Sequence, residues 1–160
     1  MTKLDSIPGA ERREGDAVKV LVVALDAAGP LSLTADSVLV IAPAVNSRLR
    51  RWLSDDDDAR RMAEERLEAY VDRLECAGVR TSGSVGDADP VQAIADALAT
   101  FAADEIVVAA HSERSCRLAG DVAERARKRF ALPIVVADDG PSRVASSTTR
   151  EYPRLRGVLA

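Results

Sequence analysis

Five short apolar runs alternate with longer, more polar stretches along this chain, and this alternation restricts the fold more than any other feature. Residues 18–25 (VKVLVVAL) and 37–42 (SVLVIA) are nearly continuous and rich in valine, as is typical of strands buried on both faces. Residues 105–110 and 133–137 follow the same pattern, whereas 79–85 (VRTSGSV) is more polar and is expected at the edge of a sheet. Strands that alternate with helices predict a parallel sheet with helices on both faces.

The first long polar stretch carries the signals of a helix. Ser54 caps a first turn of four aspartates (55–58), which complements the positive end of the helix dipole, and Gly78 ends the helix. The aspartates are interpreted as a solvated helix start and not as a metal site, because the spacing and the glycine of a calcium loop are absent. The stripe that this helix turns toward the sheet consists of Leu67, Tyr70, Val71 and Leu74.

Two further helices are predicted downstream. Asp89 caps the first of them, with Pro90 in the first helical position, and the second covers about residues 115–130. Their inner faces consist of Val91, Ile94, Leu98 and Phe101 in the first, and of Leu118, Val122, Ala126 and Phe130 in the second. A short helix is also expected over 46–53.

The connection between the first two strands is too short for a full crossover helix. It comprises residues 26–36 (DAAGPLSLTAD), which is about the minimum of 10–12 residues that a right-handed crossover needs including its helix. The Gly29-Pro30 pair near its middle leaves no room for a helix within that length. We therefore expect a bare loop or a single turn, so that the first crossover helix is shortened or missing and one apolar patch of the sheet is under-covered. Such patches usually mark interaction sites, which predicts self-association or a protein partner there. The N-terminal arm and Trp52 are alternative covers.

Length and composition indicate one domain (17–139) between a flexible N-terminal arm (1–16) and a flexible C-terminal tail (140–160). A formal net charge of −4 counts against nucleic acid as the main partner, because phosphate binding favours an excess of Lys and Arg. Cys76 and Cys116 lack the spacing of a metal site or a disulfide framework. No apolar run approaches the ~20 residues of a membrane helix, and the first residues lack the apolar middle of a signal peptide. We expect a cytoplasmic protein with no membrane partner.

Four segments resemble the universal stress protein (UspA-like) family of adenine-nucleotide-binding α/β domains, most closely an actinobacterial branch of it. They are a valine-rich first strand that ends in Asp26 (VLVVALD), the helix entry GDADPVQAI (86–94), the strand ADEIVVAA (103–110) and the closing segment GDVAERARKRFALPIVV (120–136). The resemblance implies an open sheet of five parallel strands in the order 3-2-1-4-5. It further implies a HUP (adenine nucleotide alpha hydrolase-like) fold that is often dimeric and holds ATP at the carboxyl ends of strands one and four.

The family's phosphate motif, which the resemblance implies here, is Gly-x-x-Gly, nine further residues and then Gly-Ser or Gly-Thr. Its glycines let the backbone approach the phosphate oxygens. In this chain Gly120 matches the last glycine and Val122 fits the pattern after it, but Ala110 and Glu113 stand in the first two glycine positions. The loop between them is also shortened.

Asp121 stands where the motif has its Ser or Thr. A carboxylate 4 Å from a phosphate opposes binding by about 1 kcal/mol in water and about 4 kcal/mol near a protein surface. The lost hydroxyl donor costs about 1 kcal/mol more. ATP is therefore expected to bind weakly or not at all, unless Arg114 and Arg117 compensate.

Two further residues lie at the expected carboxyl edge of the sheet. Asp26 is in the position from which, by resemblance, the family contacts adenine; the alternative, which we favour because the crossover helix is missing, is an aspartate that caps the following turn. His111, the only histidine, either is a surface or loop residue or acts in catalysis with Ser112, Glu113 or Ser115. Nothing marks these residues as a triad, so we favour the first.

Three functions follow from these observations. The first is a non-enzymatic UspA-like domain with a regulatory or stress-related role, no required cofactor and a degenerate nucleotide site, acting through protein contacts. The second is an adenine-nucleotide-binding module in which arginines replace the missing glycines. The third is a small hydrolase that uses His111.

Overall fold

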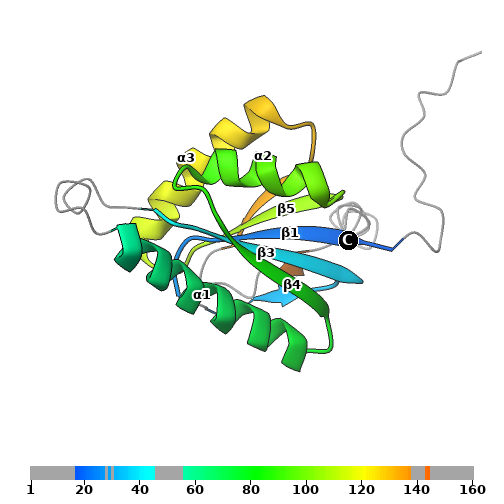
Figure 1. Cartoon of the computed structure of the whole chain (residues 1–160). Helices are drawn as coiled ribbons and strands as arrows, with labels where there is room; N and C mark the ends of the chain where they lie inside the picture. The colour runs from blue at the N-terminus through cyan, green and yellow to red at the C-terminus, as the bar shows by residue number, and fades with distance from the viewer. Residues whose placement is uncertain (1–16, 28, 30, 46–55, 138–142, 145–160) are drawn as a thin grey trace, which may run out of the picture.

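The computed structural model describes residues 17–27, 29, 31–45, 56–137 and 143–144, which form an α/β fold (Figure 1). The strands are β1 (Lys19–Ala24), β2 (Ser32–Leu33), β3 (Ser37–Pro43), β4 (Arg80–Gly86), β5 (Glu105–Ala109), β6 (Ile134–Ala137) and β7 (Arg143–Val144). The helices are α1 (Asp56–Cys76), α2 (Pro90–Thr100) and α3 (Glu113–Arg129).

Five of the strands form one parallel sheet in the order β4-β3-β1-β5-β6. This confirms the predicted order 3-2-1-4-5, and the bounds of each strand agree with its apolar run to within one residue. The polar run 79–85 lies at an edge as β4, whereas the continuous valine run is the central strand β1. The sequence pattern was informative here because a strand buried on both faces has no polar positions.

Helices cover both faces of the sheet. On one face, α2 and α3 pack on Leu21, Val23 and the alternate residues of the neighbouring strands. On the other face, α1 packs on Val20, Val22 and their neighbours. This division is the one that right-handed crossovers produce, because the chain leaves β1 toward β3 and leaves β5 toward β6 in opposite directions.

The predicted helix ends are confirmed for α1 and α2. Gly78 follows α1 with a positive φ of 81°, which only glycine adopts without strain, and the Asp89 carboxylate accepts from the backbone N–H of Val91 with Pro90 in the first turn. The start of α3 was placed wrongly. It begins at Glu113, after the N-cap Ser112, and not at about residue 115.

The first crossover contains no helix among its described residues, as predicted, but the uncovered patch of sheet was a wrong expectation. The two-residue strand β2 in the crossover pairs in parallel with β7, which lies in the segment predicted to be a tail without regular structure. Leu31 and Leu33 of the crossover pack on the α1 face of the sheet, and the β1 residues Val20, Val22 and Ala24 are at most 1% exposed. Among the described residues, Met62 is the one large hydrophobic side chain that is exposed.

Several predictions fall on residues outside the described part of the chain: the arm 1–16, the short helix 46–53 with Trp52, the cap Ser54, and the tail apart from β7. Within the described part, no helix combines the length and the hydropathy needed to cross a membrane.

Candidate functional site

The carboxyl ends of β1 and β5 lie side by side at the centre of the sheet. The chain leaves these two strands in opposite directions, and ligands of open α/β sheets bind in the crevice at such a point. Asp26 follows β1 here, and His111 and Ser112 follow β5 and precede α3. The structure therefore brings together two of the residues singled out in the sequence, Asp26 and His111.

The Asp26 carboxylate is bound by the start of α3. Its Oδ2 atom lies 2.8 Å from the backbone nitrogen of His111 and 2.8 Å from that of Ser112, and accepts from both. Burial raises the pKa of this carboxyl, but the backbone N–H groups of Ser112 and His111, with the hydroxyls of Ser115 and Ser112, outweigh it and hold the pKa below its ordinary value of 3.8. Asp26 is therefore an anion at neutral pH.

A backbone N–H group in the first turn of α3 is also hydrogen-bonded by a side chain of this protein. The Ser112 hydroxyl accepts from the Ser115 backbone nitrogen at 3.2 Å, as an N-cap does, and donates to the Ser115 hydroxyl at 2.7 Å. The positive end of a helix attracts anions. In this protein the anion at that end is a side chain of the chain itself.

His111 holds the first crossover in place. Its Nε2 atom lies 3.1 Å from the hydroxyl of Tyr70, a fully buried residue of α1. Its ring lies against Gly29, where an added Cβ would come within 2.4 Å of three ring atoms. The carbonyl of Gly29 in turn accepts from the Arg73 guanidinium. His111 is thus a partly buried residue of the loop between β5 and α3, in keeping with the surface or loop position that the sequence favoured, and its ring contacts α1 and the first crossover.

The groups beneath the crossover influence one another electrostatically. Burial and the negative charge of Asp26 raise the pKa of Tyr70 from 10.0 to about 12, against smaller opposing effects of Gly29, Arg73 and Arg66. Burial lowers the pKa of Arg66, while the negative charge of Asp26, and that of Tyr70 once its phenol has ionised, oppose that shift. Arg66 also donates to the Pro43 carbonyl at 2.7 Å, which joins α1 to the end of β3. Tyr70 is therefore a neutral phenol at physiological pH.

The other predicted nucleotide residues lie elsewhere. Gly120, Asp121 and Val122 are in the interior of α3, and Gly120 lies roughly 12 Å along the helix axis from its cap. Asp121 is exposed and lies 3.9 Å from Arg125, and Val122 is buried in the core. The match of Gly120 to the last glycine of a phosphate motif therefore stays a prediction, and in this structure that glycine lies within α3 and not at its start. Arg114 is exposed in the first turn of α3.

Four basic residues lie in the last turns of α3: Arg125, Arg127, Lys128 and Arg129. Arg125 lies 3.1 Å from both carboxylate oxygens of Asp89, the cap of α2. Arg127 donates to the Ile134 carbonyl at 3.0 Å. These contacts join α3 to α2 and to β6.

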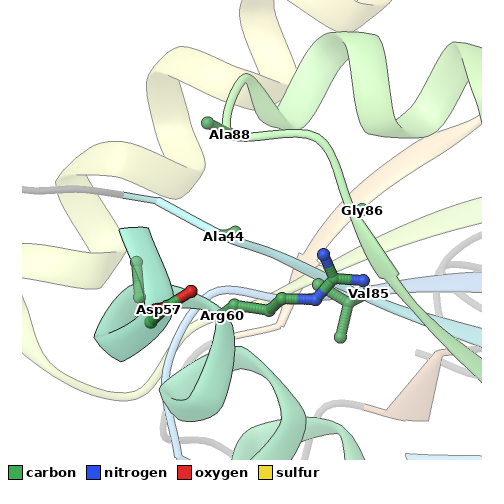
Figure 2. Close-up of a pocket in the computed structure, with 7 residues that line it drawn as sticks. Ala44, Asp57, Arg60, Val85, Gly86 and Ala88 are labelled. Carbon is green, nitrogen blue, oxygen red and sulfur yellow. The ribbon is translucent and has the colours of Figure 1, made fainter. Parts of the chain in front are cut away.

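A concavity lies at the same edge of the sheet, between the carboxyl ends of β3 and β4, the first turn of α1 and the loop before α2 (Figure 2). Its volume is about 410 Å³, within the range of small-molecule sites. Figure 2 shows the Arg60 side chain extended toward Val85, with Asp57 on the same turn of α1. The walls are otherwise small and apolar: Ala44, Ala59, Val85, Gly86 and Ala88.

Sequence reasoning missed Tyr70 and Arg66 as members of the central site, because their positions on α1 indicate only a helix face. It noted Ser112 and Ser115 but not their role. The spacing of a serine three residues before another, directly after a buried strand, is a capping signal that could have located the start of α3. Within the described part of the chain, no group of three His, Cys, Asp or Glu residues could hold a metal ion.

No protein-family model matches the chain, and a search of the curated proteins finds no match either.

Proposed function

We propose that this protein is a non-enzymatic, UspA-like domain with a regulatory or stress-related role, which acts through protein contacts and binds ATP weakly or not at all. One observation supports this most directly: the Asp26 carboxylate, an anion, already lies at this helix start and accepts from two of the backbone N–H groups there, those of His111 and Ser112. A phosphate would have to displace that carboxylate or lie beside it. Two unit charges 4 Å apart near a protein surface repel by about 4 kcal/mol.

The contacts of the potential catalytic groups favour the non-enzymatic alternative. His111 Nε2 pairs with Tyr70, whose pKa of about 12 makes it a poor proton donor at neutral pH. The Ser112 hydroxyl caps α3. A hydrolase would need the serine and the imidazole to act on one another and on a substrate, and both are engaged in holding structural elements together.

A titration of the wild-type protein with Mg-ATP and with inorganic phosphate at pH 7.5 tests this proposal. We expect no saturation with either ligand below about 1 mM. The Asp26→Ala variant frees both N–H groups and is expected to bind phosphate at least tenfold more tightly than the wild type. Asp104→Ala is the matched control, because Asp104 accepts from the Lys19 backbone nitrogen at 2.9 Å at the opposite end of β1. Micromolar ATP binding by the wild type would contradict the proposal.

A second candidate function is an adenine-nucleotide-binding module, which the 410 Å³ pocket favours. Its small apolar walls could hold a planar base, while Asp57 and Arg60 offer an acceptor and donors to the base edge. Purified protein would then release nucleotide on denaturation, measurable by chromatography at 260 nm, and an Ala44→Phe substitution, which fills the pocket, would abolish that release. Protein free of nucleotide would count against this candidate.

A further inference from the structure

β4 is an edge strand of the sheet, and among the described residues it pairs only with β3 (Figure 1). Its central residues Ser82, Gly83 and Ser84 are all exposed. Because glycine has no side chain, the exposed surface of Gly83 is backbone. An added Cβ at Gly83 would come within 2.6 Å of Leu67, so this strand approaches α1 closely on one face while its outer edge stays open.

The outer edge of β4 lacks the features that usually prevent strand pairing. Natural edge strands are protected by charged side chains, prolines, bulges or short length. Arg80, at the first position of β4, is its one charged residue, and residues 81–86 (TSGSVG) contain no charge and no proline. The strand has seven residues and pairs with β3 in unbroken register from Arg80 to Gly86, without a bulge. It can therefore accept another strand.

The pairing with β3 shows which backbone groups face outward. The Gly86 carbonyl accepts from the Ala44 nitrogen at 3.3 Å, so Gly86 directs its backbone polar groups toward β3. Successive residues of a strand direct theirs to opposite sides. Thr81, Gly83 and Val85 therefore present their N–H and C=O groups to the open edge.

Acidic side chains flank this edge on α1. Leu67 and Val71 of α1 lie over Gly83. Glu64 lies three positions before Leu67, Glu68 lies three positions before Val71, and Glu75 lies four positions after Val71. This spacing places the three glutamates on the strip of the helix surface next to Leu67 and Val71. All three are exposed. Arg60 offsets part of this charge through a contact of 3.7 Å with Glu64, but both side chains are more than half exposed, where such pairs contribute little.

The negative charge of these glutamates determines which kind of strand can pair with the open edge of β4. A second copy of the domain, joined by antiparallel pairing of its own β4, would bring two such acidic strips to the same face of the joined sheet, where they would repel. An extended segment with Lys or Arg at alternate positions would instead place its cations beside Glu64, Glu68 and Glu75 while its backbone pairs with β4.

We propose that the outer edge of β4 binds an extended basic segment of a partner protein, which adds a sixth strand to the sheet. The proposal rests on the proposed function in that it names the surface and the partner chemistry of a domain that acts through protein contacts. The peptide backbone pairs with Thr81, Gly83 and Val85, and its basic side chains contact the three glutamates.

Fluorescence anisotropy with a labelled eight-residue peptide of alternating Lys and Thr tests the proposal. We expect saturable binding to the wild type and none of the matching Glu-Thr peptide. Thr81→Pro removes an outward N–H that β3 does not use, and is expected to weaken binding at least tenfold. Thr81→Val keeps that N–H and loses the same hydroxyl, which donates to the Val79 carbonyl at 3.0 Å, so it should bind as the wild type does.

A second measurement leaves the protein unchanged, in case Thr81→Pro impairs folding. Methylating alternate backbone nitrogens of the Lys-Thr peptide removes its strand-pairing donors but keeps its charge, and should abolish binding. Three results would overturn the proposal. The methylated peptide could bind as well as the unmethylated one, or the Lys-Thr peptide could fail to bind. The wild-type protein could also form a dimer that Thr81→Pro dissociates. The ATP titration reports on the site at Asp26 alone, so either proposal can fail without the other.

Discussion

Asp26 and Ser112 are 86 residues apart in the chain, yet the Asp26 carboxylate accepts from the Ser112 backbone nitrogen at 2.8 Å. This contact joins the end of the central strand β1 to the start of α3. A side chain that caps a helix from another element contributes both hydrogen bonds and a favourable charge at the helix N-terminus. The Asp26 side chain therefore stabilises the junction between β1 and α3 at the centre of the sheet.

Replacing Asp26 by Asn should therefore destabilise the protein. The backbone N–H groups of His111 and Ser112 would lose a charged acceptor, and we expect the free energy of unfolding at pH 7 to fall by about 2 kcal/mol. Urea denaturation measures this change. Asp121→Asn is the control, because that side chain is 62% exposed and should change the stability by less than about 0.5 kcal/mol. Equal effects of the two substitutions would refute the role given to Asp26.

The contribution of Asp26 should also depend on pH. Its pKa in the folded protein is lower than in the unfolded chain, so its stabilising effect is fully present above about pH 4 and is lost as pH falls through the lowered folded pKa. The difference in stability between the wild type and Asp26→Asn should thus shrink in acid. Denaturant titrations at pH 7, 4 and 2.5 measure it. A difference that stays constant over this range would show that the Asp26 charge is not involved.

Tyr70 should limit stability in alkali. Because its pKa rises from 10.0 to about 12 on folding, the folded protein keeps the phenol proton where the unfolded chain has lost it. Stability should therefore decrease as pH rises from 10 toward 12. Absorbance at 295 nm follows the phenolate directly, and Tyr70→Phe supplies the baseline for Tyr152, the other tyrosine of the sequence. A Tyr70 that ionises near pH 10 would contradict the buried pairing with His111.

Gly29 and His111 should be energetically coupled. A Cβ on Gly29 would lie 2.4 Å from the His111 ring, so Gly29→Ala must displace the ring or the crossover and should cost about 1–3 kcal/mol. In a His111→Ala background the same substitution should cost much less. Thermal or urea unfolding of the four proteins in this double-mutant cycle measures the coupling. Additive effects would mean that the ring does not lie against Gly29.

Gly120 should be replaceable with a gain in stability. It lies inside α3, where an added Cβ meets nothing within 4 Å, so Gly120→Ala should stabilise the protein by about 0.5–1 kcal/mol. Gly86→Ala is the contrasting variant, because its Cβ would lie 2.7 Å from that of Ala93. Destabilisation by Gly120→Ala would favour the original assignment of this glycine to a phosphate loop.

The strands and two of the three helices could be predicted from the sequence because their signals are local. A valine run between turns locates a strand, and Asp89-Pro90 or Gly78 locates a helix end by the chemistry of one or two residues. The start of α3 lies two residues before the predicted one, because the apolar periodicity that located this helix does not mark its cap. The Ser112 cap and the good helix former Arg114 favour the earlier start.

Only part of the candidate site could be predicted, because some of its contacts join residues that are far apart in the sequence. Asp26 and His111 could be placed at the carboxyl edge from the strand order, since both directly follow predicted strands. The pairing of His111 with Tyr70 joins residues 41 positions apart. It depends on how α1 crosses the sheet, which helix periodicity does not fix. Likewise, two residues of β7 give no pattern from which their pairing with β2 could be inferred.

That pairing has a consequence for the order in which the protein folds. β2 belongs to the first crossover, and its partner β7 follows the last strand of the main sheet. During synthesis, all five strands of the main sheet leave the ribosome before residues 143–144 do. The β2 segment of the first crossover therefore gains its strand partner only after every strand of the main sheet has been synthesised.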